Sequence, residues 1–239
     1  MTKVLLYSGG MDSWLIDKLW KPDKKIYINI HGAYSDTELT KLPKDVEILE
    51  FPLGQFEDAK TKFVPMRNLY FLMIASNYGD ELCLGATAGD RGAIDKTPEF
   101  FDKAEEMLNF LSQKQSVFAG KHIKLERRFL EMSKDDMIKE YLANGGTIQE
   151  VYDGTFSCFN PQNGEPCLAC KPCFRRFVTM YNNGYPYTYE QKKKMYEYIK
   201  ANVLIRKNDN SGTYYADRYK EGEDCVKAVN NLIKEFEND

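Results

Sequence analysis

The sequence lacks the features of a membrane protein or of a nucleic-acid-binding protein. No apolar run reaches about 18 residues, the length that a helix needs to cross a bilayer, and the start at Met1 lacks the layout of a signal peptide. Basic and acidic residues are nearly balanced, at 33 and 36, so no basic stripe for a nucleic acid is expected. We therefore expect a cytoplasmic protein that acts on a small-molecule substrate, with no membrane partner and no nucleic-acid partner.

Histidine is scarce, and cysteine is unevenly distributed. Of the six cysteines, Cys83 and Cys225 stand alone, and the other four lie between Cys158 and Cys173. Such clustering favours a metal site in a reducing compartment over a disulfide framework. The length of 239 residues allows one main domain with a smaller extension, and the sequence contains no internal repeat.

The opening segment predicts a βαβ unit. Residues 4–7 are typical of a strand, residues 14–20 of a helix and residues 25–30 of a second strand. Because the crossover between such strands is right-handed, we expect them to lie parallel in one sheet with helices on both faces. The predicted fold class is therefore α/β with a doubly wound parallel sheet.

The turn between the first strand and the helix has the composition of a phosphate-binding loop. It consists of Ser8, Gly9, Gly10, Met11, Asp12 and Ser13. The glycine pair lets the backbone approach an anion, and the N-terminus of the helix adds positive potential. The serine hydroxyls can donate to phosphate oxygens, and Asp12 can either hold Mg²⁺ or cap the helix.

This loop belongs to neither of the two commonest phosphate-binding types. It lacks the lysine of a Walker A loop and the spacing of a dinucleotide-binding glycine turn. A loop that holds pyrophosphate without that lysine suits attack at the α-phosphate, which leaves AMP on the acceptor. An ordinary turn between a strand and a helix is the alternative.

Two later segments contain candidate ligand-binding residues. Arg67 and Asn68 precede the apolar residues 69–75, which predict a buried helix that Asn68 can cap. Arg67 either meets a phosphate or carboxylate or closes the helix end structurally. A buried strand from residue 81 leads into a loop of small residues that ends at Asp90, and ligands bind at the carboxyl ends of such strands.

The clustered cysteines predict a closed metal site. They are Cys158, Cys167, Cys170 and Cys173, separated by eight, two and two residues. Two-residue spacers let successive thiolates converge on one ion, and four thiolates complete a tetrahedral structural zinc site. An iron–sulfur cluster is the alternative. Arg175 and Arg176, which follow the cysteines, either face the active site or are solvated charges at a helix end.

Helix signals occur in the second half of the chain. Residues 133–136 predict a capping box, and Lys134 either approaches a bound phosphate or, as we favour, faces solvent. Thr188 predicts the start of a charged helix, residues 208–212 a turn, and residues 226–236 a final amphipathic helix.

Three of these motifs carry a resemblance to known families. Residues 8–13 resemble the SGGxDS signature of the PP-loop ATP pyrophosphatases. Residues 64–68, the loop that ends at Asp90 and the cysteine stretch 158–173 resemble, in the same order, the 7-cyano-7-deazaguanine (preQ0) synthase family of QueC-like proteins. The chain departs from the pattern of that family at residues 91–97, where a deazaguanine-binding run is usual.

The resemblance implies an architecture, a reaction and a set of site residues. The architecture is an adenine nucleotide alpha hydrolase-like domain over residues 1–150 and a small C-terminal zinc-binding helical lobe with an extension over residues 151–239. The implied enzyme is an ATP-dependent carbon–nitrogen ligase that converts 7-carboxy-7-deazaguanine and ammonia to preQ0 through adenylated intermediates, with ATP, Mg²⁺ and Zn²⁺. The implied residues are Ser8, Gly9, Gly10, Met11, Asp12, Ser13 and Asn68 for the nucleotide, Asp12, Ser13, Arg67 and Asp90 for catalysis, and Cys158, Cys167, Cys170 and Cys173 for zinc.

Three alternatives stay open. A related enzyme stops at the amide or uses another acceptor, which the altered residues 91–97 allow. Another PP-loop branch thiolates or amidates tRNA, and a zinc-binding interaction module would bind no ATP. The oligomeric state is open as well, although homodimers are common among such enzymes.

Overall fold

The computed structural model describes residues 1–33, 35–40, 42–158, 160–204 and 220–237. These residues form two compact units. Unit 1 comprises Met1–Ala86 and Ala93–Glu131, and unit 2 comprises Thr87–Gly92 and Met132–Asp239. The turn predicted at residues 208–212 lies outside the described residues. Within the described ranges, no helix combines the length and the apolar character that a membrane span requires.

Within the described residues, unit 1 is built on a five-stranded, all-parallel sheet. Its strands are β1 (Lys3–Leu6), β2 (Lys24–Asn29), β3 (Val46–Glu50), β4 (Glu81–Cys83) and β5 (Lys124–Leu125), in the spatial order β3-β2-β1-β4-β5. The chain runs outward from β1 through β2 to β3, and then crosses to the other side of β1 for β4 and β5. This confirms the predicted α/β doubly wound sheet, and its switch point lies between β1 and β4.

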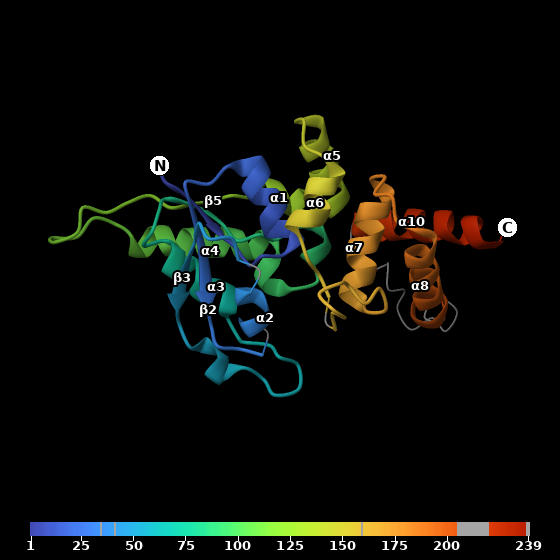
Figure 1. Ribbon diagram of the computed structural model, residues 1–239. Coiled ribbons are helices and arrows are strands. Elements are labelled where there is room, and N and C mark those ends of the chain that lie inside the picture. The colour runs from blue at the N-terminus through green and yellow to red at the C-terminus, as the bar shows by residue number, and fades with distance from the viewer. Residues whose placement is uncertain (34, 41, 159, 205–219, 238–239) are drawn as a thin grey trace. The chain divides into compact units, whose positions relative to one another are not determined.

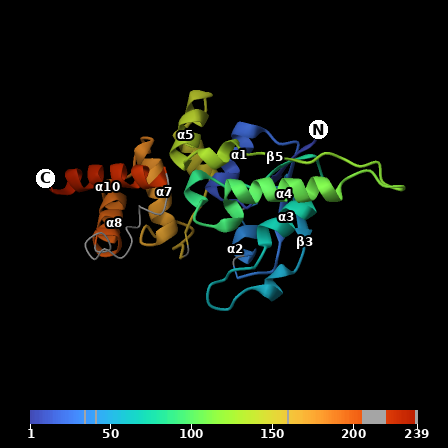
Figure 2. The ribbon, with the colours of Figure 1, turned by 180° about the vertical axis from the view of Figure 1, so that it is seen from behind.

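Helices cover both faces of this sheet. They are α1 (Met11–Trp20), α2 (Ser35–Leu39), α3 (Arg67–Ala75) and α4 (Pro98–Leu111), with short 3₁₀ segments η1 (Leu53–Phe56), η3 (Ile94–Lys96) and η4 (Arg128–Glu131). α1 lies on one face, and α3 and α4 lie on the other (Figures 1 and 2). Leu72, Leu82 and Phe101 are almost fully buried in the core. Each such side chain contributes about 1.5–3 kcal/mol of hydrophobic stabilisation.

The start of α3 differs from the sequence prediction. The helix begins at Arg67 after Met66, which has a φ of 56°, and no side chain caps it. Asn68 is therefore the second residue of the helix, and its predicted role as a cap is wrong. Within α3, only Asn68, Leu72 and Ala75 are buried, so one face of the helix packs on the sheet.

Unit 2 is helical. Its elements are the 3₁₀ turn η2 (Ala88–Asp90), α5 (Lys134–Ala143), α6 (Ile148–Gly154), α7 (Lys171–Asn182), α8 (Tyr189–Ile199), the π-helical segment η5 (Lys200–Leu204) and α10 (Glu221–Glu237). The capping boxes expected at Ser133 and Thr188 are present, and α10 contains the predicted final helix. The predicted boundary at residue 150 falls inside α6, whereas the second unit takes over at Met132, because α5 packs on both α6 and α7.

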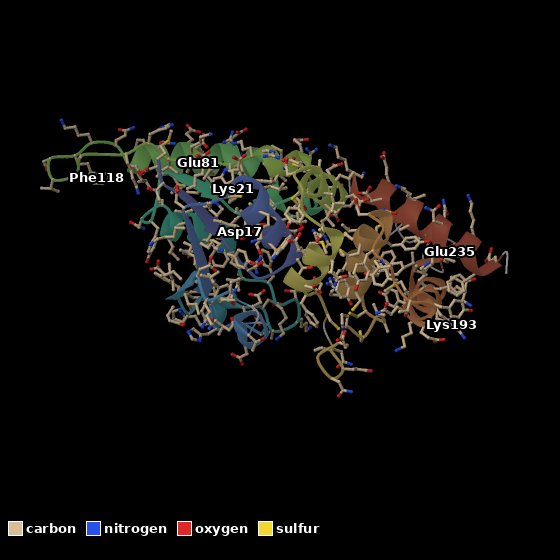
Figure 3. All side chains as sticks on the ribbon, turned by 45° about the horizontal axis from the view of Figure 1, so that its top comes forward. Asp17, Lys21, Glu81, Phe118, Lys193 and Glu235 are labelled. Atoms are coloured by element: carbon tan, nitrogen blue, oxygen red, sulfur yellow. The ribbon has the colours of Figure 1, made fainter. Side chains whose placement is uncertain are left out.

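Glu235 joins α10 to two other helices of unit 2. This side chain, which Figure 3 labels, accepts hydrogen bonds from Tyr181 on α7 and, at 2.8 Å, from Lys192 on α8. The rings of Tyr196 and Phe236 stack beside it, with centroids 4.9 Å apart. Polar and aromatic contacts thus hold the C-terminal part of α10 on α7 and α8.

A buried carboxyl group lies where α10 packs on α5. Asp135 on α5 is 1% exposed. Burial and, to a smaller extent, the charge of Asp224 on α10 raise the pKa of Asp135 to about 7. A hydrogen bond from Asn182 and the charges of Lys139 and Lys227 act in the opposite direction without cancelling the shift. The folded state therefore favours the neutral form of this acid.

Unit 2 is expected to lose stability as the pH rises from about 4 to 7. Below 3.8, Asp135 is protonated in both the folded and the unfolded chain, whereas between 3.8 and about 7 only the folded chain keeps the proton. Asp135 therefore lowers the unfolding free energy by up to about 1.4 kcal/mol per pH unit in this window. Asp135→Asn should remove this contribution, and Asp153→Asn, at an exposed acid on α6, should retain it. Urea unfolding across the pH range measures both, and equal slopes in the two variants would contradict the assignment.

Candidate functional site

A cavity of about 230 Å³ lies in unit 1 at the switch point of the sheet. Its walls include Tyr7 and Gly85, which follow the carboxyl ends of β1 and β4, and Ile28 and Ile30 at the end of β2. Doubly wound sheets bind ligands in this crevice, because the strand order reverses there and the loops on either side diverge. The cavity therefore lies at the point where the chain leaves β1 and enters the predicted phosphate loop.

Part of the predicted phosphate loop lines this cavity. The lining residues are Ser8, Gly10, Asp12 and Ser13. Ser13 Oγ accepts a hydrogen bond from the backbone N–H of Ser8 at 3.3 Å and donates to the carbonyl oxygen of Gly10 at 3.0 Å. These bonds close the turn on itself, so the loop is pre-formed at the N-terminus of α1, the end of a helix that attracts anions.

The other two loop residues shape the turn. Gly9 has a φ of 74°, a left-handed conformation that glycine adopts without steric cost. Met11 begins α1 and is 4% exposed, so its side chain packs in the interior. Because Gly10 is the N-cap of α1, Asp12 does not cap the helix and instead lies in its first turn. The role of Asp12 as the cap is therefore wrong, and its role in holding Mg²⁺ stays a prediction.

Arg67 and Asn68 line the same cavity from the start of α3. The Arg67 guanidinium lies 5.8 Å from the ring centroid of Phe71, one turn along the helix. Asn68 is 3% exposed, and its Nδ2 donates to the backbone carbonyl of Asp95 at 3.3 Å. Asn68 therefore ties α3 to η3, and Arg67 brings a positive charge to the cavity.

Among the described residues, the cavity also has polar and aromatic side chains that the sequence analysis did not identify. They are Tyr7, Tyr27, Glu38, Phe71 and Lys96. The signal that could have found some of them was their position after a strand. Tyr7 directly follows β1, and Glu38 belongs to the first helix after β2, at the edge of the sheet where ligands bind.

Asp90 belongs to unit 2, and two of its contacts are with the neighbouring Thr87. Its carboxylate accepts hydrogen bonds at 3.3 Å from both the backbone N–H and the hydroxyl of Thr87. The Thr87 hydroxyl accepts in turn from the backbone of Asp90, which completes a capping box around η2. The role of Asp90 beside a ligand stays a prediction.

The four clustered cysteines of unit 2 converge on one point. The sulfur atoms of Cys158, Cys167, Cys170 and Cys173 all lie within 4.8 Å of one another. The sulfurs of Cys167 and Cys173 are 3.9 Å apart, close to the edge of about 3.8 Å in a tetrahedron whose metal–sulfur bonds are about 2.3 Å long. The group therefore fits four thiolates around a single metal ion. An iron–sulfur cluster, whose cysteines bind different iron atoms, would need sulfurs that lie further apart.

Backbone donors prepare one of these sulfurs for a metal. Cys158 Sγ accepts hydrogen bonds from the backbone N–H groups of Asn160 at 3.3 Å and Cys167 at 3.4 Å. Burial raises the pKa of the Cys158 thiol, but these bonds, together with hydrogen bonds from the Cys167 and Cys173 side chains, lower the pKa overall. A lowered pKa favours the thiolate, which is the form that binds a metal.

Arg176 is buried and has a structural role. It is 6% exposed and donates to the carbonyl oxygens of Tyr152 at 2.6 Å and Thr155 at 2.9 Å. Its guanidinium also lies 4.2 Å from the ring centroid of Tyr152. The expectation of a solvated charge is therefore wrong for this residue. Arg176 lies on α7, and its hydrogen bonds join α7 to the C-terminal end of α6.

Lys134 is buried too, so the solvent-facing position favoured from the sequence is wrong. Its side chain is 10% exposed, and Nζ lies 3.4 Å from Oε1 of Glu221. Arg175 Nη2 lies 3.2 Å from the other oxygen of the same carboxylate. A Cβ atom on Gly89 would overlap the Glu221 carboxyl group, so this arrangement requires a glycine at position 89. Lys134 on α5 and Arg175 on α7 thus both pair with Glu221, the first residue of α10.

Comparison with known sequences links the chain to one family. The sequence model described as "QueC: Queuosine biosynthesis protein QueC" matches residues 18–184. The match leaves out β1 and the glycine loop at the start of the chain, and α8 and α10 at its end. A protein named 7-cyano-7-deazaguanine synthase from Leptospira biflexa serovar Patoc is 30% identical over 129 residues, covering 52% of this chain and 50% of that protein. The chain thus spans half the length of this relative. No solved structure matches the chain.

Two further relatives with the same name are covered over more of their length. The one from Thermoplasma volcanium is 28% identical over 201 residues, with 80% of this chain and 78% of the relative covered. The one from Aquifex aeolicus is 31% identical over 215 residues, with 72% of this chain and 93% of the relative covered.

The cysteine cluster is expected to bind one divalent metal ion per chain. Reconstitution with Co²⁺ should produce thiolate-to-metal charge-transfer absorption and the visible bands of a tetrahedral site. Cys170→Ser should bring the bound metal well below one ion per chain, because one thiolate of the closed site is lost. Cys225→Ala, at an isolated cysteine on α10, should bind metal like the wild type. Full metal content in Cys170→Ser, measured by mass spectrometry after desalting, would show that the cluster is not the site.

Glu221→Gln is expected to lower the unfolding free energy by about 3–5 kcal/mol, because it removes the negative charge that pairs with the buried Lys134 ammonium. Glu223→Gln, at an exposed position in the same turn of α10, should change the stability by less than about 0.5 kcal/mol. Adding Lys134→Met to Glu221→Gln should restore part of the loss, since the remaining buried charge is removed. Chemical unfolding of the wild type, these three variants and the single variant Lys134→Met tests this, and additive effects of Glu221→Gln and Lys134→Met would argue against a direct pair.

Proposed function

Because the chain belongs to the QueC family, we propose that it is an ATP-dependent 7-cyano-7-deazaguanine (preQ0) synthase. As a carbon–nitrogen ligase it would use 7-carboxy-7-deazaguanine and ammonia as substrates. The observation that carries the proposal is the pre-formed glycine loop that lines the switch-point cavity of a chain from this family. The names of the relatives from Leptospira, Thermoplasma and Aquifex support the same reaction.

The proposed reaction uses adenylation twice. A carboxylate oxygen of the substrate attacks the α-phosphorus of ATP, and pyrophosphate leaves. Ammonia then displaces AMP to give an amide and releases a proton. The amide oxygen is adenylated in the same way, and loss of AMP and a further proton forms the nitrile.

The loop residues would bind the phosphates during both adenylations. The backbone N–H groups at the start of α1 and the hydroxyls of Ser8 and Ser13 would hold the departing pyrophosphate. Asp12 would hold Mg²⁺, whose charge offsets the negative charge that develops on the leaving group. Arg67 and Asn68 would position the nucleotide and the acceptor, and we assign Asp90 a role in the same reaction.

We assign nucleotide binding to unit 1 and a structural zinc site to unit 2. The four thiolates suit Zn²⁺ and leave no coordination position for a substrate, so the metal would hold the segment before α7 to the first turns of that helix. The clustering of four of the six cysteines in a metal site suits a reducing compartment such as the cytoplasm.

A second candidate is an enzyme that stops at the amide or adenylates another carboxylate. The observation that favours it is the departure of residues 91–97 from the family pattern. Lys96, which lies in this stretch, lines the cavity. A different acceptor would require different contacts there, while the phosphate loop would stay unchanged.

The proposal is tested by incubating the zinc-loaded protein with ATP, Mg²⁺, ammonium and 7-carboxy-7-deazaguanine. Production of the nitrile, with AMP and pyrophosphate released, is the expected result, and mass spectrometry of the deazaguanine measures it. Asp12→Ala should lower the turnover on the order of 10²–10³-fold, because the charge on the leaving group is no longer offset.

Asp102→Ala serves as the matched control, because Asp102 is an exposed acid on α4 whose side chain pairs with Arg127. Its turnover should equal that of the wild type. Release of AMP with only the amide formed would support the second candidate. Absence of ATP binding by the wild type would refute both.

A further inference from the structure

A buried tyrosine holds a carboxylate at the wall of the cavity. Tyr27 on β2 is 5% exposed, and its hydroxyl donates to Oε2 of Glu38 on α2 at 2.9 Å. Both side chains line the cavity. The phosphate loop and Arg67 offer donors and positive charge to a ligand, so the acidic Glu38 serves a different part of the ligand.

Tyr27 acts as a fixed donor. Burial and, to a smaller extent, the charge of Glu38 raise the pKa of Tyr27, so its hydroxyl keeps the proton at neutral pH. The hydrogen bond therefore stabilises Glu38 as a carboxylate and fixes the direction of one of its oxygens. A carboxylate has about four acceptor sites on its two oxygens, so Glu38 can accept a hydrogen bond from a ligand while it accepts one from Tyr27.

The side of the cavity that β2 contributes is otherwise apolar. Ile28 and Ile30 come from the end of β2, and Phe71 comes from α3. An acceptor among aliphatic and aromatic side chains suits a nitrogen heterocycle, which is apolar on its faces and has N–H donors on its edge. Phosphates do not suit this wall, because Glu38 would repel them.

We propose that Glu38, oriented by Tyr27, is a specificity-determining residue that accepts hydrogen bonds from the amino edge of a bound heterocycle. This inference rests on the proposed function, which supplies two ligands with such an edge. One is the adenine of ATP, with its 6-amino group, and the other is the deazaguanine, with its 2-amino group and ring N–H. Both present the same chemistry, and the experiment distinguishes them.

The test is equilibrium binding of ATP, inosine triphosphate and 7-carboxy-7-deazaguanine to the zinc-loaded wild type and to Glu38→Gln. Glutamine keeps the shape of the side chain but replaces one acceptor oxygen by an amide donor. The dissociation constant for the ligand that Glu38 contacts should rise on the order of tenfold to a hundredfold. The constant for the other ligand should stay within a factor of two.

The pattern across the ligands identifies the heterocycle. If Glu38 contacts adenine, the wild type should prefer ATP over inosine triphosphate, which lacks the 6-amino group, and Glu38→Gln should lose this preference. If Glu38 contacts the deazaguanine, only the binding of that compound should weaken. In either case Tyr27→Phe should raise the dissociation constant of the same ligand by a few-fold. This substitution removes the hydrogen bond that orients the Glu38 carboxylate but keeps the carboxylate itself.

Two controls separate this inference from the proposed function and from misfolding. Glu47→Gln, at an exposed position on β3 where Glu47 pairs with Lys24, should bind all three ligands like the wild type. Thermal unfolding identifies any variant that is not folded. Wild-type binding of both substrates by a folded Glu38→Gln would overturn the inference and leave the proposed function standing. Failure of the wild type to bind either substrate would instead refute the proposed function.

Discussion

The parallel pairing of β1 with both β2 and β4 is the constraint on which the rest of unit 1 depends. Because all the described strands of the sheet point the same way, the loops at their carboxyl ends lie along one edge of the sheet. The strand order reverses beside β1, so the loops that follow β1 and β4 run in opposite directions and leave a space between them. The cavity forms at this point, with the glycine loop and the N-terminus of α1 on one side and apolar residues from the end of β2 on another. The division of chemistry within the cavity is thus a result of the topology.

Unit 2 differs from unit 1 in what its packing achieves. Its helices bury charged and polar groups together with their partners, whereas the sheet of unit 1 positions loops around a cavity. Glu221 neutralises Lys134 and contacts Arg175, and Arg176 satisfies the carbonyl groups at the end of α6. Asp135 avoids an uncompensated charge by favouring its neutral form. The cysteine group adds a fourth arrangement of this kind, because a bound metal ion would neutralise sulfurs that crowd one another.

The sequence predicted those features whose signal is local. A short apolar run before a glycine pair identified β1 and the start of α1, and closely spaced cysteines identified the metal site. β3 was missed because Val46–Glu50 contains two glutamates and lies mostly exposed at the edge of the sheet. Lys134 was misplaced because its partner Glu221 lies in a helix at the other end of the chain, and no local pattern reports such a pair. Glu38 was missed because α2 is short and gives no motif.

The ion pair between Lys134 and Glu221 links a part of the chain that the family model matches to a helix that lies beyond the match. Lys134 lies within the residues that match the family, and α10 lies beyond them. In a homologue without α10, the lysine would lose the Glu221 carboxylate, and burying its charge would cost more. The lysine at position 134, the glycine at position 89 and the C-terminal helix therefore depend on one another. We expect relatives of this chain to have all three or none of them.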